Sequence, residues 1–357
     1  MKKTELRIKL QKIKFETDYQ EGAHPKILER LLASNLEQTS GYGADSHCEN
    51  AKNLIRKVIG KSNAEIFFAV GGTQSNTIAI KFLLNPCEGV ISVQSGHINV
   101  HESGAIEATG HKVITLPHHN GLMDADDLKN YLAAFYANPT WPHMTPPGMV
   151  YISYSSEYGT LYTKEMLTKI KAVCDEYKLN LFIDGARLGA GLMSEAADMN
   201  IKDIANLCDA FYIGGTKNGA LFGEAIVFPK PEKFNFRLMT TLIKQQGGLL
   251  AKGRLLGLQF EVLFENDLYF ENAKHADIQA MKIKKAFSEA KIPFLFESFT
   301  NQQFPILTQE QHKKLSSEFD YEIWEPLDGN KIAVRFVTSW ATTDDNVDRL
   351  VKAIKAL

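Results

Sequence analysis

Residues 64–84 read AEIFFAVGGTQSNTIAIKFLL, and this stretch decides the fold class. Its first part, Ala64–Val70, is a short apolar run that predicts a buried strand. A Gly-Gly-Thr turn follows, and Thr77–Leu84 then predicts a helix. An apolar run without polar alternation is typical of a parallel strand that is buried on both faces of its sheet.

The same spacing of strand and helix continues along the chain. Further strands are predicted at residues 89–93, 113–116, 149–154, 180–183, 210–213 and 224–228, and further helices at 100–108, 124–135 and 164–177. This alternation predicts an α/β fold, with a mainly parallel seven-stranded sheet covered by helices on both faces.

The stretch FPKPEKF at residues 228–234 ends this pattern. Residues 235–270 are expected to be largely helical, and those from about 275 to form a smaller α+β unit. Its expected elements are strands at 294–296, 303–307 and 332–337 and a closing helix at 345–357. We therefore predict an N-terminal arm (1–28), a large domain (29–245) and a helical connection with a small C-terminal domain (246–357).

Composition excludes several classes of function. The 357 residues carry 40 basic and 42 acidic side chains, a net charge of −2, which gives no bulk electrostatic attraction for nucleic acid. No apolar run approaches the roughly 18–20 residues of a spanning helix. The four cysteines are scattered without a CxxC pair, which predicts a cytoplasmic protein with neither a disulfide framework nor a four-cysteine zinc site.

The start of the chain, MKKTELRIKLQKIKF, is basic but lacks the continuous apolar stretch of a signal peptide. Leu6, Leu10 and Ile13 could line one face of a short helix or arm. We favour a frayed terminus or a subunit contact over membrane targeting.

Three motifs follow predicted strands, where α/β sheets gather their ligands. VGGTQSN at 70–76 offers free amides and hydroxyls to a phosphate, although a GG turn is most often only a tight turn. DGAR at 184–187 places a carboxylate and an arginine in one crevice, or is a helix cap beside a solvated arginine. GGTKNG at 214–219 holds Lys217 where desolvation can lower an amine's pKa, although most single lysines lie on the surface.

Together these motifs match what pyridoxal phosphate (PLP) requires. Its phosphate needs amides and hydroxyls, its ring nitrogen needs a carboxylate, and its aldehyde needs an amine.

The ordered motifs resemble the low-specificity threonine aldolases, in the β-eliminating-lyase branch of fold-type I PLP enzymes. The resemblance spans nearly the whole chain. It rests on DYQEGAHPKIL (18–28), GYGAD (41–45), GGTQSN (71–76), GHINVHESGA (96–105), EYGTLY (157–162), DGARL (184–188), GGTKNGALFGEA (214–225) and Arg335. It implies the aspartate-aminotransferase-like fold and cleavage of a 3-hydroxy amino acid to glycine and an aldehyde.

The resemblance also implies roles for individual residues. Lys217 carries the cofactor, Asp184 pairs with its ring nitrogen, and His97 lies over its ring. The other implied cofactor contacts are Gly72, Thr73, Gln74, Arg187, Thr216 and Lys252. The implied substrate contacts are Thr17, Asp18, Arg187 and Arg335.

Lys244 and Lys252 are implied contacts near the phosphate that a neighbouring subunit would lend. A homodimer or homotetramer with shared active sites is implied as well.

Two departures from the family pattern affect the details. Glu157 stands where many members carry a histidine, so the catalytic base is either His97 or a water held by His97 and Glu157. YGAD at 42–45 replaces the usual YGDD, which bears on substrate range and stereochemistry.

The residues also bear on three other kinds of function. A β-eliminating lyase or an amino-acid racemase would use the same lysine, aspartate and phosphate cradle. A metalloenzyme could use His97 and His101 at i, i+4, but no HExxH motif accompanies them, and we expect no metal. A silent binding protein would have lost Lys217 or Asp184, and both are present.

Overall fold

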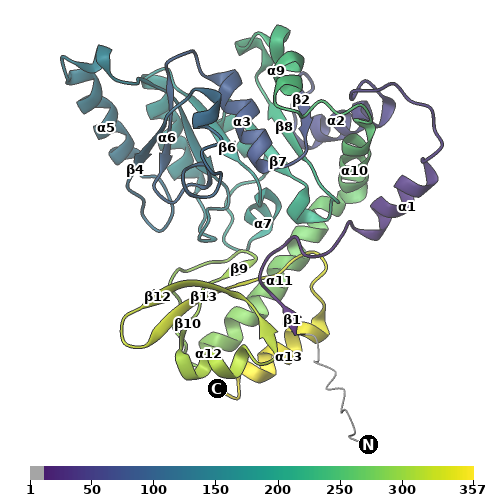
Figure 1. The fold of residues 1–357 in the computed structure, drawn as a ribbon, viewed down its shortest axis with the longest axis vertical. Helices are drawn as coiled ribbons and strands as arrows, with labels where there is room; N and C mark the ends of the chain where they lie inside the picture. The colour runs from purple at the N-terminus through teal and green to yellow at the C-terminus, as the bar shows by residue number, and fades with distance from the viewer. Residues whose placement is uncertain (1–11) are drawn as a thin grey trace, which may run out of the picture.

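The computed structural model describes residues 12–357, so the predicted contacts of Leu6 and Leu10 lie outside the described residues. A seven-stranded sheet forms the centre of the larger part of the molecule (Figure 1). In spatial order its strands are β2 (Glu65–Ala69), β8 (Glu224–Phe228), β7 (Ala210–Gly214), β6 (Asn180–Asp184), β5 (Pro147–Ser153), β3 (Gly89–Val93) and β4 (Val113–Leu116). Only β8 runs antiparallel to its neighbours, which confirms the predicted mainly parallel sheet.

Helices cover both faces of this sheet because each strand is apolar on both sides. On β5, for example, Tyr151 packs into one core and Ile152 into the other. One face carries α3 (Gly72–Leu83), α4 (His97–Val100) and α9 (Met239–Gln245). The opposite face carries α1 (Pro25–Ala33), α2 (Ser46–Ile59), α5 (Ala125–Ala137), α6 (Lys164–Glu176), α7 (Leu188–Met193), α8 (Ile201–Leu207) and α10 (Arg254–Phe264).

A smaller C-terminal part is joined to the larger one by α11 (Leu268–Glu289), which runs from one part into the other (Figure 1). Its antiparallel sheet contains β12 (Glu322–Leu327), β13 (Lys331–Val337) and β10 (Ile306–Thr308), and β9 (Gln302–Gln303) pairs with the end of β13. The remaining elements are α12 (Gln309–Leu315), α13 (Asp344–Ile354) and the pair β1 (Ile13–Lys14) with β11 (Phe319–Asp320). These elements enclose a separate apolar core.

Short 3₁₀ turns complete the chain. They are η1 (Glu107–Thr109), η2 (Trp141–His143), η3 (Thr216–Asn218), η4 (Pro231–Lys233), η5 (Phe236–Leu238) and η6 (Glu265–Asp267).

The structure differs from the sequence predictions in four places. The helix predicted at 100–108 is wrong, because α4 ends at Val100 and the positive φ angles of Ser103 and Gly104, 52° and 74°, are not helical. The strand at 294–296 is wrong, since only an isolated bridge joins Phe294 to Pro305. The strand predicted at 303–307 is split at Pro305, which has no N–H to donate. The helical connection was expected to end near residue 275, but α11 extends to Glu289.

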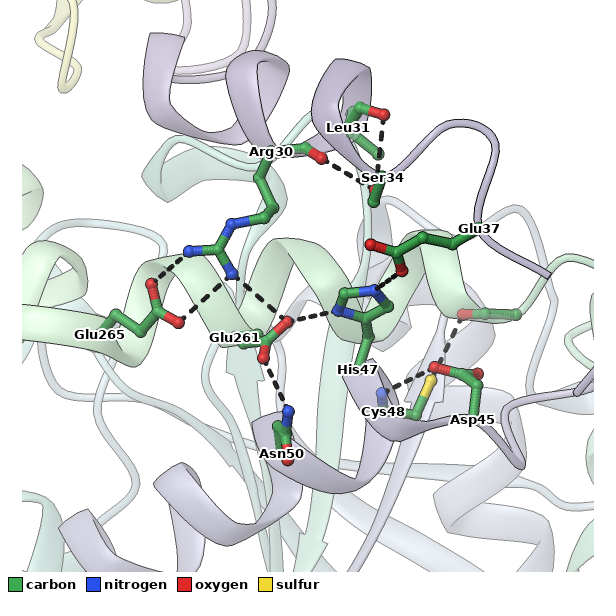
Figure 2. Close-up of polar contacts among 11 residues, drawn as sticks. Arg30, Leu31, Ser34, Glu37, Asp45, His47, Cys48, Asn50, Glu261 and Glu265 are labelled. Atoms are coloured by element: carbon green, nitrogen blue, oxygen red, sulfur yellow. Dashed lines mark hydrogen bonds and ion pairs between the residues drawn. The ribbon is translucent and has the colours of Figure 1, made fainter. Parts of the chain in front are cut away.

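A polar network ties α1 and α2 to α10 (Figure 2). Arg30 donates to both oxygens of Glu265, at 3.3 and 2.8 Å. His47 lies between two carboxylates, with Nδ1 2.6 Å from Glu261 Oε2 and Nε2 2.9 Å from Glu37 Oε2. Burial disfavours the charged imidazolium, but the two carboxylates outweigh it and raise the pKa of His47. The network therefore holds the N-terminal helices against the core of the larger part.

None of the helices in residues 12–357 combines the length and the apolar character that a membrane crossing requires.

Candidate active site

A cavity of about 340 Å³ opens where β5, β6 and β7 end and α3 begins. This is the edge at which parallel sheets collect their ligands. Its wall includes eight of the residues that the sequence predicted. They are Gly72, Thr73, His97, Glu157, Asp184, Arg187, Thr216 and Lys217.

Asp184 ends β6 and is held on both oxygens by donors. Oδ1 accepts from the Tyr212 hydroxyl at 2.5 Å and from the backbone N of Ala186 at 3.0 Å. Oδ2 accepts from the Tyr151 hydroxyl at 2.6 Å and from Asn76 Nδ2 at 3.0 Å. Burial and the Asp184 charge raise the pKa of both tyrosines, so both phenols stay protonated and donate. The carboxylate is therefore fixed in one orientation.

Lys217 lies in the cavity wall with its amine uncommitted. Within residues 12–357, Nζ makes no hydrogen bond or ion pair, and it lies 5.9 Å from the centre of the Tyr19 ring. Burial and then Arg187 lower the pKa of the amine, against the opposing charges of Asp18, Asp184 and Glu224. A lowered pKa increases the neutral, nucleophilic fraction of the amine.

Glu224 braces the turn that carries Lys217. Its Oε2 accepts from the backbone N of Gly215, and its Oε1 accepts from Thr216 Oγ1, both at 2.8 Å. Burial raises the pKa of Glu224 to about 7 against these hydrogen bonds. The hydroxyl proton of Thr216 is thus donated to Glu224, so the predicted contact of Thr216 with a phosphate stays a prediction.

The start of α3 forms a cradle of free amides. Gly71 caps the helix, and the amides of the first turn have no partner within the helix. A Cβ on Gly71 would meet nothing within 4 Å, which shows open space beside it. Gln74 braces this loop: its side chain accepts from the backbone N of Val70 and donates to the carbonyl of Gln246, both at 3.0 Å.

His97 and Glu157 lie together on the wall of the cavity. Glu157 Oε1 accepts from the backbone N of His97 at 3.0 Å and from Ser153 Oγ at 2.6 Å. Burial raises the pKa of Glu157 above its ordinary value, against the Ser153 hydrogen bond. A carboxyl with a raised pKa beside a cavity is suited to proton transfer.

The His97–His101 pair was a candidate for metal binding. The two rings are 5.6 Å apart, and His97 Nδ1 lies 2.8 Å from Glu102 Oε1. In the described part of the chain, no group of three or more His, Cys, Asp or Glu side chains gathers as a metal site.

Six of the predicted substrate and cofactor contacts lie outside the cavity wall, Gln74 and Lys244 among them. Asp18 is buried behind it and binds Arg187. Arg335 donates from Nη1 to Gln302 Oε1 at 3.0 Å and pairs with Glu322. Thr17 is half-buried and Lys252 is exposed, and neither lines the cavity.

Several residues of the site were missed by the sequence analysis. They are Tyr19, Asn76, Glu102, Tyr151, Ser153, Tyr212 and Glu224. Most lie within buried helices or strands, where a polar side chain is costly unless it is hydrogen-bonded. Glu224 gave the clearest signal of such a buried polar side chain, because it is a lone acidic residue at the start of the apolar run EAIVF.

Known proteins match this chain over almost its full length. Residues 14–310 match the β-eliminating lyase family. The solved structure of Leishmania major threonine aldolase is 43% identical, with a TM-score of 0.92 over 96% of this chain and 99% of that one. A low specificity L-threonine aldolase from Pseudomonas sp. is 28% identical over 96% of this chain and 97% of its own length.

A Thermus thermophilus aspartate aminotransferase, 14% identical with a TM-score of 0.70, covers 97% of this chain and 92% of its own and shows the shared fold alone. The predicted aspartate-aminotransferase-like fold is confirmed. The chain belongs to the β-eliminating lyase family.

Proposed function

We propose that this chain is a PLP-dependent carbon–carbon lyase. It cleaves a 3-hydroxy amino acid of the threonine or allo-threonine type to glycine and an aldehyde. The observation that carries the proposal is that Lys217, Asp184 and the start of α3 open on one cavity of about 340 Å³. The full-length likeness to proteins named threonine aldolases supports the choice of reaction within the family.

The residues of the cavity fit the three polar parts of PLP. Lys217, whose amine is uncommitted, would hold the aldehyde, and Asp184 would hold the ring nitrogen. The amides that start α3 would hold the phosphate, in the open space beside Gly71. His97 would lie against the ring. When bound, PLP supplies an aldehyde and a protonated ring that draws electrons from the bonds at the substrate's α-carbon.

The chain's own residues bind the substrate and move its proton. Arg187, which lines the cavity, and Arg335 would bind the amino-acid carboxylate, since both are mostly buried guanidinium groups. His97, or a water held by His97 and Glu157, would take the proton of the β-hydroxyl. Glu157 would hold that water through Oε2, because its Oε1 already accepts two hydrogen bonds.

We also propose a homodimer or homotetramer, in the cytoplasm, that shares its active sites. Lys244 and Lys252 do not line their own cavity, so they would act on a neighbouring copy. A second cavity has a volume of about 750 Å³ and is lined by residues that include Tyr42 and Gly253. Gly253 directly follows Lys252 in the chain. Each chain would divide into the arm (1–28), the large domain (29–245) and the connection with the small domain (246–357).

A product assay tests the reaction. The purified PLP-loaded protein is incubated separately with L-threonine, L-allo-threonine and L-serine. We expect glycine and acetaldehyde in equal amounts from the first two substrates. Pyruvate and ammonia from serine, without glycine from any substrate, would show a β-eliminating lyase instead. Formation of the opposite enantiomer without cleavage would show a racemase.

A further inference from the structure

Glu102 is a buried carboxylate that lies outside the cavity wall. Its side chain is fully buried in the protein interior. Oε1 accepts from Asn76 Nδ2 at 2.7 Å and lies 2.8 Å from His97 Nδ1. Oε2 has no hydrogen-bond partner in the described part of the chain. Burying a carboxylate costs free energy unless it is well paired, and the pairing of Glu102 is incomplete. A role for its contact with His97 would account for this cost.

The backbone is shaped to bring Glu102 to His97. On a continuous helix, residues five apart would point about 140° away from each other. Here α4 ends at Val100, and His101 leaves the helical conformation with φ −127° and ψ 10°. This early end of the helix, which periodicity did not predict, directs Glu102 inward toward the imidazole.

The contact determines which nitrogen of His97 carries a proton. An ionised carboxylate can only accept hydrogen bonds. Glu102 Oε1 therefore accepts from Asn76 Nδ2 and also from Nδ1–H of His97. When a carboxylate holds Nδ1–H, the neutral ring has Nε2 free to accept a proton. His97 lines the cavity, where the proton of the β-hydroxyl must go.

Asn76 connects this pair to the carboxylate on the other side of the site. Its Nδ2 donates to Glu102 Oε1 at 2.7 Å and to Asp184 Oδ2 at 3.0 Å. The buried amide of Asn76 therefore sets the spacing between Glu102, which orients His97, and Asp184, which is assigned to the ring nitrogen.

We propose that Glu102 is a positioning residue for His97: it keeps the proton on Nδ1 and presents Nε2 as the proton acceptor of the cavity. This inference rests on the proposed function. It adds a group that acts through His97 and that touches neither substrate nor cofactor.

The test replaces Glu102 by leucine, which is of similar size and has no hydrogen-bond acceptor; a glutamine would keep an oxygen for Asn76 and for Nδ1–H of His97. We expect Glu102→Leu to lower kcat on L-threonine about 100-fold or more while KM changes less than about 3-fold, as when an orienting carboxylate is lost from a histidine. Glu107→Leu is the matched control, because Glu107 is exposed and lies five residues further along. It should retain the parent kcat.

A double variant separates positioning from a general structural effect. If Glu102 acts through His97, adding Glu102→Leu to His97→Gln should change kcat less than 3-fold. A further large loss in the double variant would overturn the proposal, and so would parental kcat in Glu102→Leu alone.

The tautomer gives a readout that needs no reaction. In the cofactor-free, ¹⁵N-histidine-labelled protein, the His97 ring signals are assigned by their loss in His97→Gln. We expect a protonated Nδ1 in the parent and a protonated Nε2 in Glu102→Leu, because no acceptor then holds Nδ1–H. An unchanged tautomer would contradict the proposal even if the product assay succeeds, and a changed one would support it even if that assay fails. Should Glu102→Leu not fold, Glu102→Asp replaces it, since it withdraws the carboxylate by one methylene.

Discussion

Arg187 donates two hydrogen bonds to Asp18, from Nε to Oδ2 at 2.7 Å and from Nη2 to Oδ1 at 3.1 Å. Asn301 Nδ2 donates to the same carboxylate at 2.9 Å. The N-terminal segment, the loop after β6 and a loop of the smaller part therefore meet at one buried group. Burial opposes its charge, but Arg187 and then Lys217 hold the pKa of Asp18 below its ordinary value.

Removing this carboxylate should destabilise the protein. We expect Asp18→Asn to lower the free energy of unfolding by about 3–5 kcal/mol at pH 7, because Arg187 would keep a buried charge without its partner. A lowered pKa stabilises the fold above the ordinary pKa of about 4, and this stability is lost as the pH falls further. The loss should therefore shrink below pH 4. Urea unfolding across this pH range measures it, with the exposed Asp328→Asn as control.

Lys217→Ala should abolish turnover and the covalent attachment of PLP. The parent should be yellow, and borohydride should bleach it and fix the cofactor to Lys217, which peptide mass spectrometry can locate. The exposed Lys112→Ala should behave as the parent does. Full activity in Lys217→Ala would remove its assigned role.

Glu157→Gln should lower kcat by about 10²–10⁴-fold, the range for loss of positioned proton transfer, if Glu157 holds the water that accepts the proton. The amide oxygen can still accept from the His97 backbone and from Ser153, so KM should change little. Because the pKa of Glu157 is raised, kcat/KM of the parent should climb with pH through a value above the ordinary carboxyl range. The variant should lack this rise. Unchanged cleavage would leave His97 or a water as the base.

His47 should make stability depend on pH through the network shown in Figure 2. Its pKa is raised in the fold, so its contribution is complete below about pH 6.5 and is lost as the pH rises through the folded pKa. We expect His47→Gln to cost about 1 kcal/mol at pH 6 and less at pH 9. Thermal melts of the two proteins at both values test this. An equal difference at both pH values would contradict the assignment.

Asp277→Asn should stabilise the protein at alkaline pH. Both carboxyl oxygens are buried without a hydrogen-bond partner among residues 12–357, and burial raises the pKa of Asp277 well above its ordinary value. An acid with a raised pKa loses stability as the pH rises above about 4, and the amide removes that loss. A gain of about 1–3 kcal/mol is expected at pH 8, and a smaller one at pH 5. Melting temperatures that are equal or lower at pH 8 would refute this.

The sequence predicted the larger sheet well because its signals are local. Apolar runs such as EAIVF are typical of strands in a sheet that is covered on both faces, and the predicted bounds of β3, β4 and β8 match the structure. Periodicity failed where single residues changed the backbone. Ser103 and Gly104 take positive φ angles inside a predicted helix, and Pro305 split a predicted strand by lacking an N–H.

The sequence by itself determined the family, the α/β architecture and eight residues of the cavity wall, because these follow strand ends that a parallel sheet brings to one edge. Only the tertiary structure showed what holds those residues. Asn76, Tyr151 and Tyr212 lie 108, 33 and 28 residues from Asp184, which they hold. Glu102 and Glu224 are closer in sequence to the groups they hold, but no helix or strand period predicts those contacts. Hydrogen bonds between buried side chains depend on positions in space, which the packing of the whole sheet decides.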